Sequence, residues 1–196
     1  MNGSLSHGPE LGPRFEEALG YAFRLHAHQN RKGKSTPYIA HLLSVTALVL
    51  EAGGDEDQAI AALLHDAVED QGGLARLEEI RDHFGPRVAA IVEGCTDSFT
   101  TPKPPWQQRK EAYLKHLKTA PRDVLLVSLA DKLHNARSIL TDLRKEGEQT
   151  WERFRGGKQG SLWYYRSLVT IFQERFPGSM ADELSRVVDR IEVFSE

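Results

Sequence analysis

Apolar residues recur at helical spacing along almost the whole chain, and glycines and prolines divide the pattern into short segments. No segment shows the alternation of apolar and polar residues that indicates a strand, and no hairpin signal joins two such runs. A length of 196 residues is enough for one domain with a substantial hydrophobic core. The sequence therefore predicts an all-α fold, a single helical bundle of about eight to nine helices.

The Gly and Pro positions set the expected boundaries. Residues 1–12 are predicted to be disordered, residues 30–36 to form a loop, and 13–196 to form one domain. Asp55 is a suitable N-cap for the third helix. The helices are expected at 13–26, 37–52, 56–70, 74–84, 86–95, 106–118, 121–143, 161–176 and 179–194.

Composition excludes several classes of protein. The net charge of −3 argues against a strongly basic nucleic-acid binder. The single cysteine, Cys95, rules out an internal disulfide and a cysteine-based zinc site. No apolar run is long enough for a membrane span, and the first ten residues lack the apolar core of a signal peptide. We expect a cytoplasmic protein with no membrane or nucleic-acid partner, and its oligomeric state, including a homo-oligomer, is left open.

The third predicted helix carries a histidine and three acids in an apolar setting. His65, Asp66, Glu69 and Asp70 lie within two turns, on an arc of roughly 140° of the expected helix. Three carboxylates so close repel one another unless protons or a cation compensate. A divalent metal bound by His65 and Asp66 would relieve that repulsion. The alternative is a solvated acidic helix face.

Two further polar residues stand in apolar helices. His41 lies near the start of the second predicted helix, and Asp131 lies in 124–133, the most apolar stretch of the chain. Because a buried unpaired acid is costly, Asp131 needs a cation, a donor or a metal; Asn135 follows one turn later. Singly, each also fits a satisfied buried group. Together with His65 and Asp66, they suit octahedral Mn²⁺ or a related metal with open positions.

Three segments in this order resemble a known family. They are Arg31-Lys32 followed by the Thr-Pro-Tyr-Ile-Ala-His of 36–41, the Leu-Leu-His-Asp-Ala-Val-Glu-Asp of 63–70, and the Leu-Ala-Asp-Lys-Leu-His-Asn-Ala-Arg of 129–137. The chain is similar to the HD phosphohydrolase superfamily and, within it, to the hydrolase domain of RelA/SpoT-type alarmone enzymes, which include stand-alone small alarmone hydrolases. The similarity spans about residues 15–175. Its specific element is His-Asp-x-x-Glu-Asp.

The resemblance implies hydrolysis of the 3′-pyrophosphate of ppGpp or pppGpp, giving GDP or GTP and pyrophosphate. It assigns Mn²⁺ to His41, His65, Asp66 and Asp131. It assigns Glu69 and Asp70 to the catalytic pair that activates water. The substrate contacts that it implies, with a looser alignment for the first and last, are Arg24, Arg31, Lys32, Asn135 and Tyr164.

A polyphosphorylated nucleotide also needs cations around it. Three basic segments are candidates, although each also fits a solvated helix face or loop. The first leads into the second predicted helix, the second spans 103–118, and the third spans 153–166. Their members are Arg24, Arg31, Lys32 and Lys34; Lys103, Arg109, Lys110, Lys115 and Lys118; and Arg153, Arg155, Lys158 and Arg166.

Two other functions fit the same residues. The chain could be an HD phosphatase acting on another nucleotide, such as NADPH or a nucleoside monophosphate. It could instead be a catalytically inactive nucleotide-sensing domain, although the complete set of His41, His65, Asp66, Asp131, Glu69 and Asp70 argues against this. Released pyrophosphate, as opposed to phosphate, distinguishes the first two functions.

Overall fold

The computed structural model describes residues 10–100 and 102–195, and within them it confirms the predicted all-α fold. The N-terminal half contains α1 Pro13–Leu25, α2 Ile39–Glu51, α3 Glu56–Leu64, α4 Ala67–Asp70, α5 Gly73–Phe84 and α6 Pro86–Cys95. The C-terminal half contains α7 Trp106–Leu117, α8 Arg122–Glu146, the 3₁₀ helix η1 Gly147–Arg153, α9 Gly157–Arg175 and α10 Ser179–Val193. The predicted disorder of 1–12 falls largely on residues 1–9, outside the described residues.

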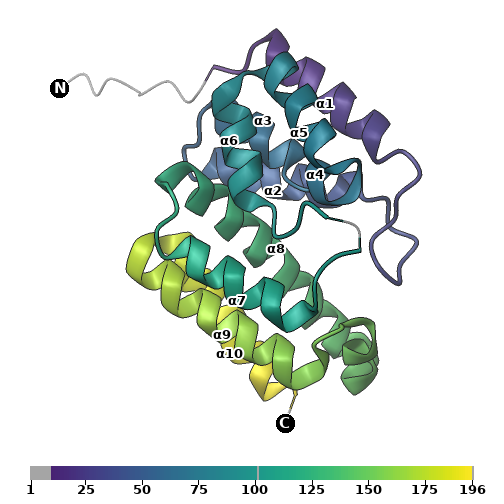
Figure 1. The fold of residues 1–196 in the computed structure, drawn as a ribbon. Coiled ribbons are helices and arrows are strands. Elements are labelled where there is room, and N and C mark those ends of the chain that lie inside the picture. The colour runs from purple at the N-terminus through teal and green to yellow at the C-terminus, as the bar shows by residue number, and fades with distance from the viewer. Residues whose placement is uncertain (1–9, 101, 196) are drawn as a thin grey trace, which may run out of the picture.

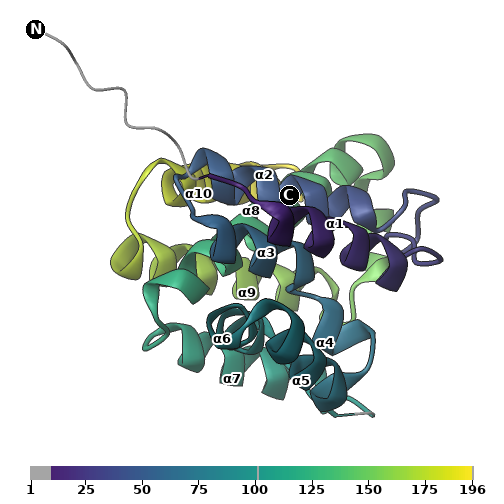
Figure 2. The ribbon, with the colours of Figure 1, turned by 90° about the horizontal axis from the view of Figure 1, so that it is seen from above.

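Helix α8 runs through the middle of the molecule, between α1–α6 on one side and α7, α9 and α10 on the other (Figure 1). It contributes to two hydrophobic clusters. Leu126, Val127 and Ala130 pack in the cluster of the N-terminal helices, where α3 lies between α2 and α6 (Figure 2). Leu129 and Leu133 pack in the C-terminal cluster. The first half of the helix, residues 124–133, is apolar on nearly all sides because both halves of the molecule bury it.

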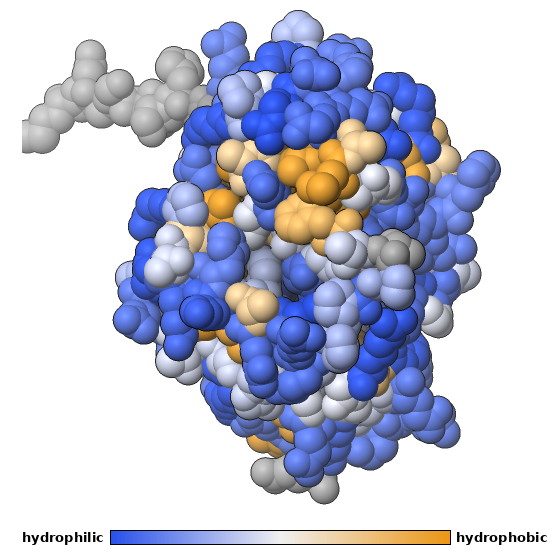
Figure 3. All heavy atoms as spheres, viewed as in Figure 1, coloured by the Kyte–Doolittle hydropathy of each residue, from blue (hydrophilic) through white to orange (hydrophobic). Residues whose placement is uncertain are grey.

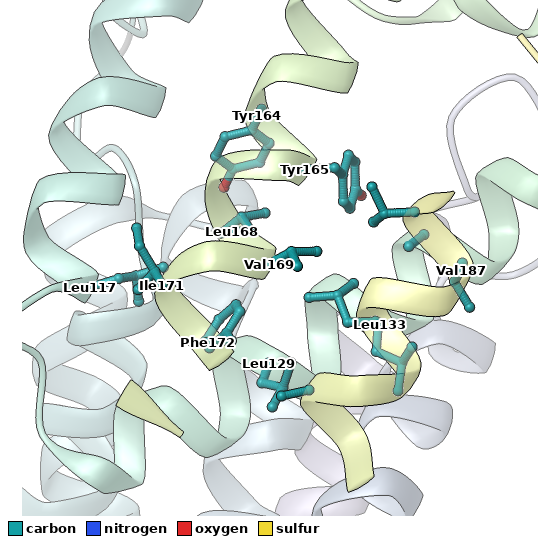
Figure 4. Packing of buried hydrophobic residues seen from close by; sticks show 14 of the residues in the cluster. Leu117, Leu129, Leu133, Tyr164, Tyr165, Leu168, Val169, Ile171, Phe172 and Val187 are labelled. Atoms are coloured by element: carbon teal, nitrogen blue, oxygen red, sulfur yellow. The ribbon is translucent and has the colours of Figure 1, made fainter. Parts of the chain in front are cut away.

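The C-terminal cluster is built on α9 and α10. Figure 4 shows Phe172 of α9 directed toward Leu129 of α8, and Leu168 packs in the same cluster. Helix α9 begins at Gly157, not at residue 161 as predicted, and η1 occupies part of the segment expected to be a charged connection. The predicted boundary was wrong because Gly156 and Gly160 were interpreted as breaks. A Cβ at Gly156 would lie 2.6 Å from the Trp106 ring, so these glycines make room for the indole.

The predicted helix at 56–70 is interrupted. Asp55 caps its start as expected, in a reciprocal capping box with Gln58. The helix ends at Leu64, however, and resumes as the one-turn α4 at Ala67. His65 Nδ1 hydrogen-bonds the Ala62 carbonyl at 2.8 Å, which is the acceptor that an unbroken helix offers to the Asp66 N–H. His65 and Asp66 therefore lie in a turn, and the assumption that they share one continuous helix face with Glu69 and Asp70 was wrong.

No helix in the described part of the chain combines the length and the hydropathy needed to cross a bilayer. The face seen in Figure 3 is largely hydrophilic, and its apolar side chains gather mainly between α5 and α6.

Candidate metal centre

Four side chains from three parts of the fold converge beside α8. His41 comes from α2, His65 and Asp66 from the turn between α3 and α4, and Asp131 from the middle of α8. The His41 Nε2 atom lies 3.4 Å from Asp66 Oδ2 and 3.3 Å from Asp131 Oδ1. The His65 Nε2 atom lies 3.1 Å and 3.6 Å from the same two oxygens. The structure thus brings together all four residues predicted to bind a metal.

The donor set fits a divalent cation. Donors about 2.1 Å from an ion and at right angles to each other lie about 3 Å apart, close to the observed separations. The Nε2 atoms of His41 and His65 are buried and have no hydrogen-bond partner. Buried polar atoms are ordinarily satisfied. Two orphaned imidazole nitrogens that face two carboxylate oxygens therefore indicate that a cation completes the site.

The far side of each imidazole is held by the protein. Because His65 Nδ1 bonds the Ala62 carbonyl, its Nε2 atom is left available as a ligand. His41 Nδ1 lies 2.8 Å from His134 Nδ1, and burial, with His41 and Arg31 nearby, lowers the pKa of His134 to about 4. The Nδ1 atom of a neutral His134 can accept a hydrogen bond from the Nδ1–H group of His41. His134 thus supports His41 on the side of the ring away from the other ligand side chains.

Both carboxylates are also fixed by neighbouring donors. The Tyr38 hydroxyl donates to Asp66 Oδ2 at 2.6 Å, and Lys132 Nζ donates to Asp131 Oδ2 at 2.6 Å. Asn135 Nδ2 donates to Asp131 Oδ1. The need of Asp131 for a cation or donor was predicted, but the roles of Tyr38 and Lys132 were missed. A lysine directly after a buried acid in an apolar stretch was the available signal.

The electrostatics of the cluster favour a bound cation. Burial alone would lower the pKa of His65, but Asp66 and Asp131 outweigh it and raise this pKa well above its ordinary value. Burial opposes ionisation of Asp66, yet His65 and His41 hold its carboxyl pKa well below the usual range. Lys132, with His41 and His65, likewise outweighs the burial of Asp131 and holds its carboxyl pKa well below the usual range. The two acids therefore stay ionised, and a metal ion can take the place of the proton that they favour on His65.

The predicted catalytic pair lies on α4, in the turn after Asp66. Lys103 Nζ lies 2.7 Å from Glu69 Oε1 and 3.6 Å from Asp70 Oδ1. Asp97 lies nearby, and its own carboxylate is paired with Arg109 and Lys110. Burial, with the charge of Asp97, raises the pKa of Glu69, and Lys103 counteracts part of that rise. The second predicted basic segment thus supplies partners for this pair.

A cavity of about 560 Å³ adjoins the cluster, and Tyr38, Lys132 and Asn135 line it. Four of the five predicted substrate contacts also line this cavity: Arg31, Lys32, Asn135 and Tyr164. Arg31 donates to Asn135 Oδ1, which joins two of them to the Asp131 ligand. Arg24 is exposed on α1 and is not among the lining residues. Lys34, Asp70, Ser138, Asp142 and Arg153 also line the cavity.

The family of the chain follows from a match to the HD domain over residues 18–162. The chain belongs to the HD-domain family. All four converging residues, His41, His65, Asp66 and Asp131, lie inside the matched range.

The chain is also similar to particular proteins of this family. A Xenopus tropicalis protein named guanosine-3′,5′-bis(diphosphate) 3′-pyrophosphohydrolase MESH1 is 41% identical over 142 residues, 71% of this chain and 74% of that protein. A guanosine-3′,5′-bis(diphosphate) 3′-pyrophosphohydrolase of Aquifex aeolicus is 36% identical over 69% of this chain, which spans 19% of that longer protein. A solved structure of a metazoan SpoT orthologue, described as hydrolysing ppGpp, superposes with a TM-score of 0.76 at 28% identity, covering 92% of this chain and 97% of that one.

Proposed function

We propose that this chain is a divalent-metal-dependent hydrolase that removes the 3′-pyrophosphate from ppGpp and pppGpp, giving GDP or GTP and pyrophosphate. The observation that carries the proposal is the convergence of four metal-ligand side chains, with two unpartnered imidazole nitrogens, beside a cation-lined cavity. The names of the Xenopus and Aquifex relatives supply the substrate. The reaction consumes one water and breaks the bond between the 3′-oxygen and phosphorus.

His41, His65, Asp66 and Asp131 would hold the metal, and Mn²⁺ is the ion that we propose. When bound, the ion would make water more acidic and polarise a phosphate oxygen. The mixed imidazole and carboxylate set is compatible with several divalent metals. Metal-free protein reloaded with Mn²⁺, Mg²⁺, Zn²⁺ or Co²⁺ tests the assignment. The highest turnover is expected with Mn²⁺, and inactivity with Mn²⁺ alongside activity with another ion would contradict it.

Residues of the chain itself accept the proton of the attacking water and neutralise the negative charge of the phosphates. Glu69 accepts the proton of the attacking water or orients it, and Asp70 acts with it as one unit. Lys103, already paired with both carboxylates, neutralises negative charge where the phosphate enters. Arg31, Lys32, Asn135 and Tyr164, which line the cavity, contact the nucleotide.

A nucleotide panel with Mn²⁺, analysed for pyrophosphate and phosphate separately, tests the function. Pyrophosphate from ppGpp is the expected product. Phosphate released only from NADPH or a nucleoside monophosphate would overturn the proposal in favour of a different HD phosphatase. Residues 13–196 are proposed to act as one hydrolase domain on a small-molecule substrate, and a cytoplasmic location is part of the same proposal.

A further inference from the structure

The end of the cavity away from the cluster contains a group of charges that the proposed reaction does not use. Lys34, from the loop of residues 30–36, places Nζ 2.6 Å from Asp142 Oδ1 and 3.2 Å from Ser138 Oγ. Arg153 of η1 lies 3.6 Å from Asp142 Oδ2 and also bonds Glu146. One nearly buried carboxylate thus fixes two cations from segments far apart in the sequence.

The backbone of the loop is shaped for this arrangement. Gly33 has φ of +69°, a conformation that side chains rarely adopt. A Cβ at this position would lie 2.6 Å from Cδ of Arg153. The aliphatic part of Arg153 therefore packs on the bare glycine backbone. This contact sets the distance between the loop and η1, and with it the spacing of Lys34 and Arg153.

Lys34 and Arg153 are separated from the metal cluster along the axis of α8. Asp131, Asn135, Ser138 and Asp142 follow one face of α8 at intervals of three or four residues. At 1.5 Å per residue, Ser138 is about 10 Å and Asp142 about 16 Å along the helix from Asp131. A nucleotide with its 3′-phosphates at the cluster would direct another part of the molecule toward Lys34 and Arg153.

The charge at this end favours an anionic group. The cavity is lined by six cationic side chains and two acidic ones, Asp70 and Asp142. The side chains of Lys34 and Arg153 are 27% and 19% exposed, so each retains accessible surface. The Glu146 side chain is 44% exposed, and solvent therefore weakens its pairing with Arg153. An arginine fork beside a lysine is a typical phosphate-binding combination.

We propose that Lys34 and Arg153 form a second phosphate subsite, which takes the 5′-polyphosphate of a nucleotide whose 3′-pyrophosphate is hydrolysed at the cluster. Asp142, Ser138 and Gly33 hold the two cations in place. The subsite would make the 5′-phosphates necessary for efficient hydrolysis, so that a nucleotide with a 3′-pyrophosphate and a free 5′-hydroxyl is a poor substrate. This inference rests on the proposed function for the identity of the nucleotide, but not for the presence of the subsite.

The test compares guanosine 5′-diphosphate 3′-diphosphate with guanosine 3′-diphosphate, which has a free 5′-hydroxyl. Steady-state pyrophosphate release gives kcat and KM for each. The double variant Lys34→Met/Arg153→Met removes both charges but keeps the aliphatic contact with Gly33. Lys145→Met and Arg186→Met are matched controls, because both residues are exposed, outside the cavity lining and outside the three basic segments.

Wild type and both controls are expected to prefer the 5′-phosphorylated substrate by at least about tenfold in kcat/KM, since each charge-assisted bond to phosphate is worth about that factor. In the double variant the preference should shrink to about twofold, through a higher KM for the 5′-phosphorylated substrate alone. A preserved preference, or an equal loss on both substrates, would overturn the subsite.

A second measurement separates failure of the subsite from failure of the proposed function. If wild type hydrolyses neither substrate, the proposed function fails. Calorimetric titration with GDP and with guanosine then tests the subsite alone. Tighter binding of GDP by wild type, lost in a double variant with an unchanged melting temperature, supports it. Equal binding of GDP and guanosine by wild type overturns it.

Discussion

The four metal-cluster residues and the carboxylate pair are neighbours, yet the protein holds them in different ways. Three of the four cluster residues, His41, His65 and Asp131, are at most 6% exposed, and only Asp66, with a side chain 22% exposed, resembles the pair. Helices or the turn after α3 supply the cluster residues and their hydrogen-bond partners. The side chains of Glu69 and Asp70 are 23% and 28% exposed, and their lysine partner comes from a proline-rich loop. The cluster is held by partners from buried helices, whereas the pair depends on a lysine from a loop.

Removing a cluster residue should have the largest effect. We expect Asp131→Ala to abolish metal binding and reduce turnover by more than about a hundredfold, since even outer partners of metal ligands cost about 10–100-fold. Metal content and pyrophosphate release measure the two effects. His116→Ala, an exposed histidine on α7, is the control. A variant that keeps stoichiometric metal and full turnover would remove Asp131 from the centre.

Variants of the carboxylate pair, Glu69 and Asp70, should lose turnover but keep metal and nucleotide binding. Glu69→Gln and Asp70→Asn are each expected to lower kcat by about 10²–10⁴-fold, the usual range for a proton-transfer group. Metal content and nucleotide affinity should change little, because these side chains do not belong to the cluster. Single-turnover assays and calorimetry check this split. Loss of metal from either variant would show that the two regions are not independent.

A variant of His134 tests whether the hydrogen-bond partner of His41 contributes to metal binding. His134→Ala removes the partner of His41 Nδ1, so the imidazole loses its fixed orientation. We expect metal affinity to fall by about 10–100-fold, with kcat at saturating metal close to that of the wild type. Competition with a chelator measures the affinity. A fall in kcat that excess metal does not restore would give His134 a more direct role.

The smallest effect is expected on the pH profile. Since Lys103 lowers the pKa of Glu69 and Asp97 raises it, Lys103→Met should move the acid limb of kcat to higher pH, and Asp97→Asn should move it to lower pH. A base with a higher pKa is ionised only at higher pH, which fixes both signs. Shifts in the same direction, or none, would mean that Glu69 is not the titrating base. Lys118→Met is the control.

The same contrast explains how far the sequence could predict this molecule. The helices and the four cluster residues were predictable, because His41 and Asp131 are polar residues in strongly apolar helices. The partners of the carboxylate pair were not. Lys103 lies 34 residues from Glu69 in a segment without helical periodicity, so no local pattern joins them.

Other failures have local physical causes. The break at His65 depends on which acceptor its side chain takes, a competition that spacing alone does not reveal. The early start of α9 depends on the fit of Trp106 to Gly156 and Gly160. The pairing of Lys34 and Arg153 on Asp142 joins the loop of residues 30–36 to α8 and η1, although Lys34 and Asp142 are 108 residues apart. Long-range contacts of this kind are set by the tertiary fold and have no sequence period.

The position of α8 has a consequence for folding. Its side chains complete both hydrophobic clusters, so neither half can bury its apolar surface while this helix is unformed. We therefore expect the two halves to melt together, in one cooperative transition followed equally by tryptophan fluorescence, which reports on the C-terminal half, and by helical circular dichroism. The active centre would then have no partly folded precursor, and it would appear only when the whole bundle does.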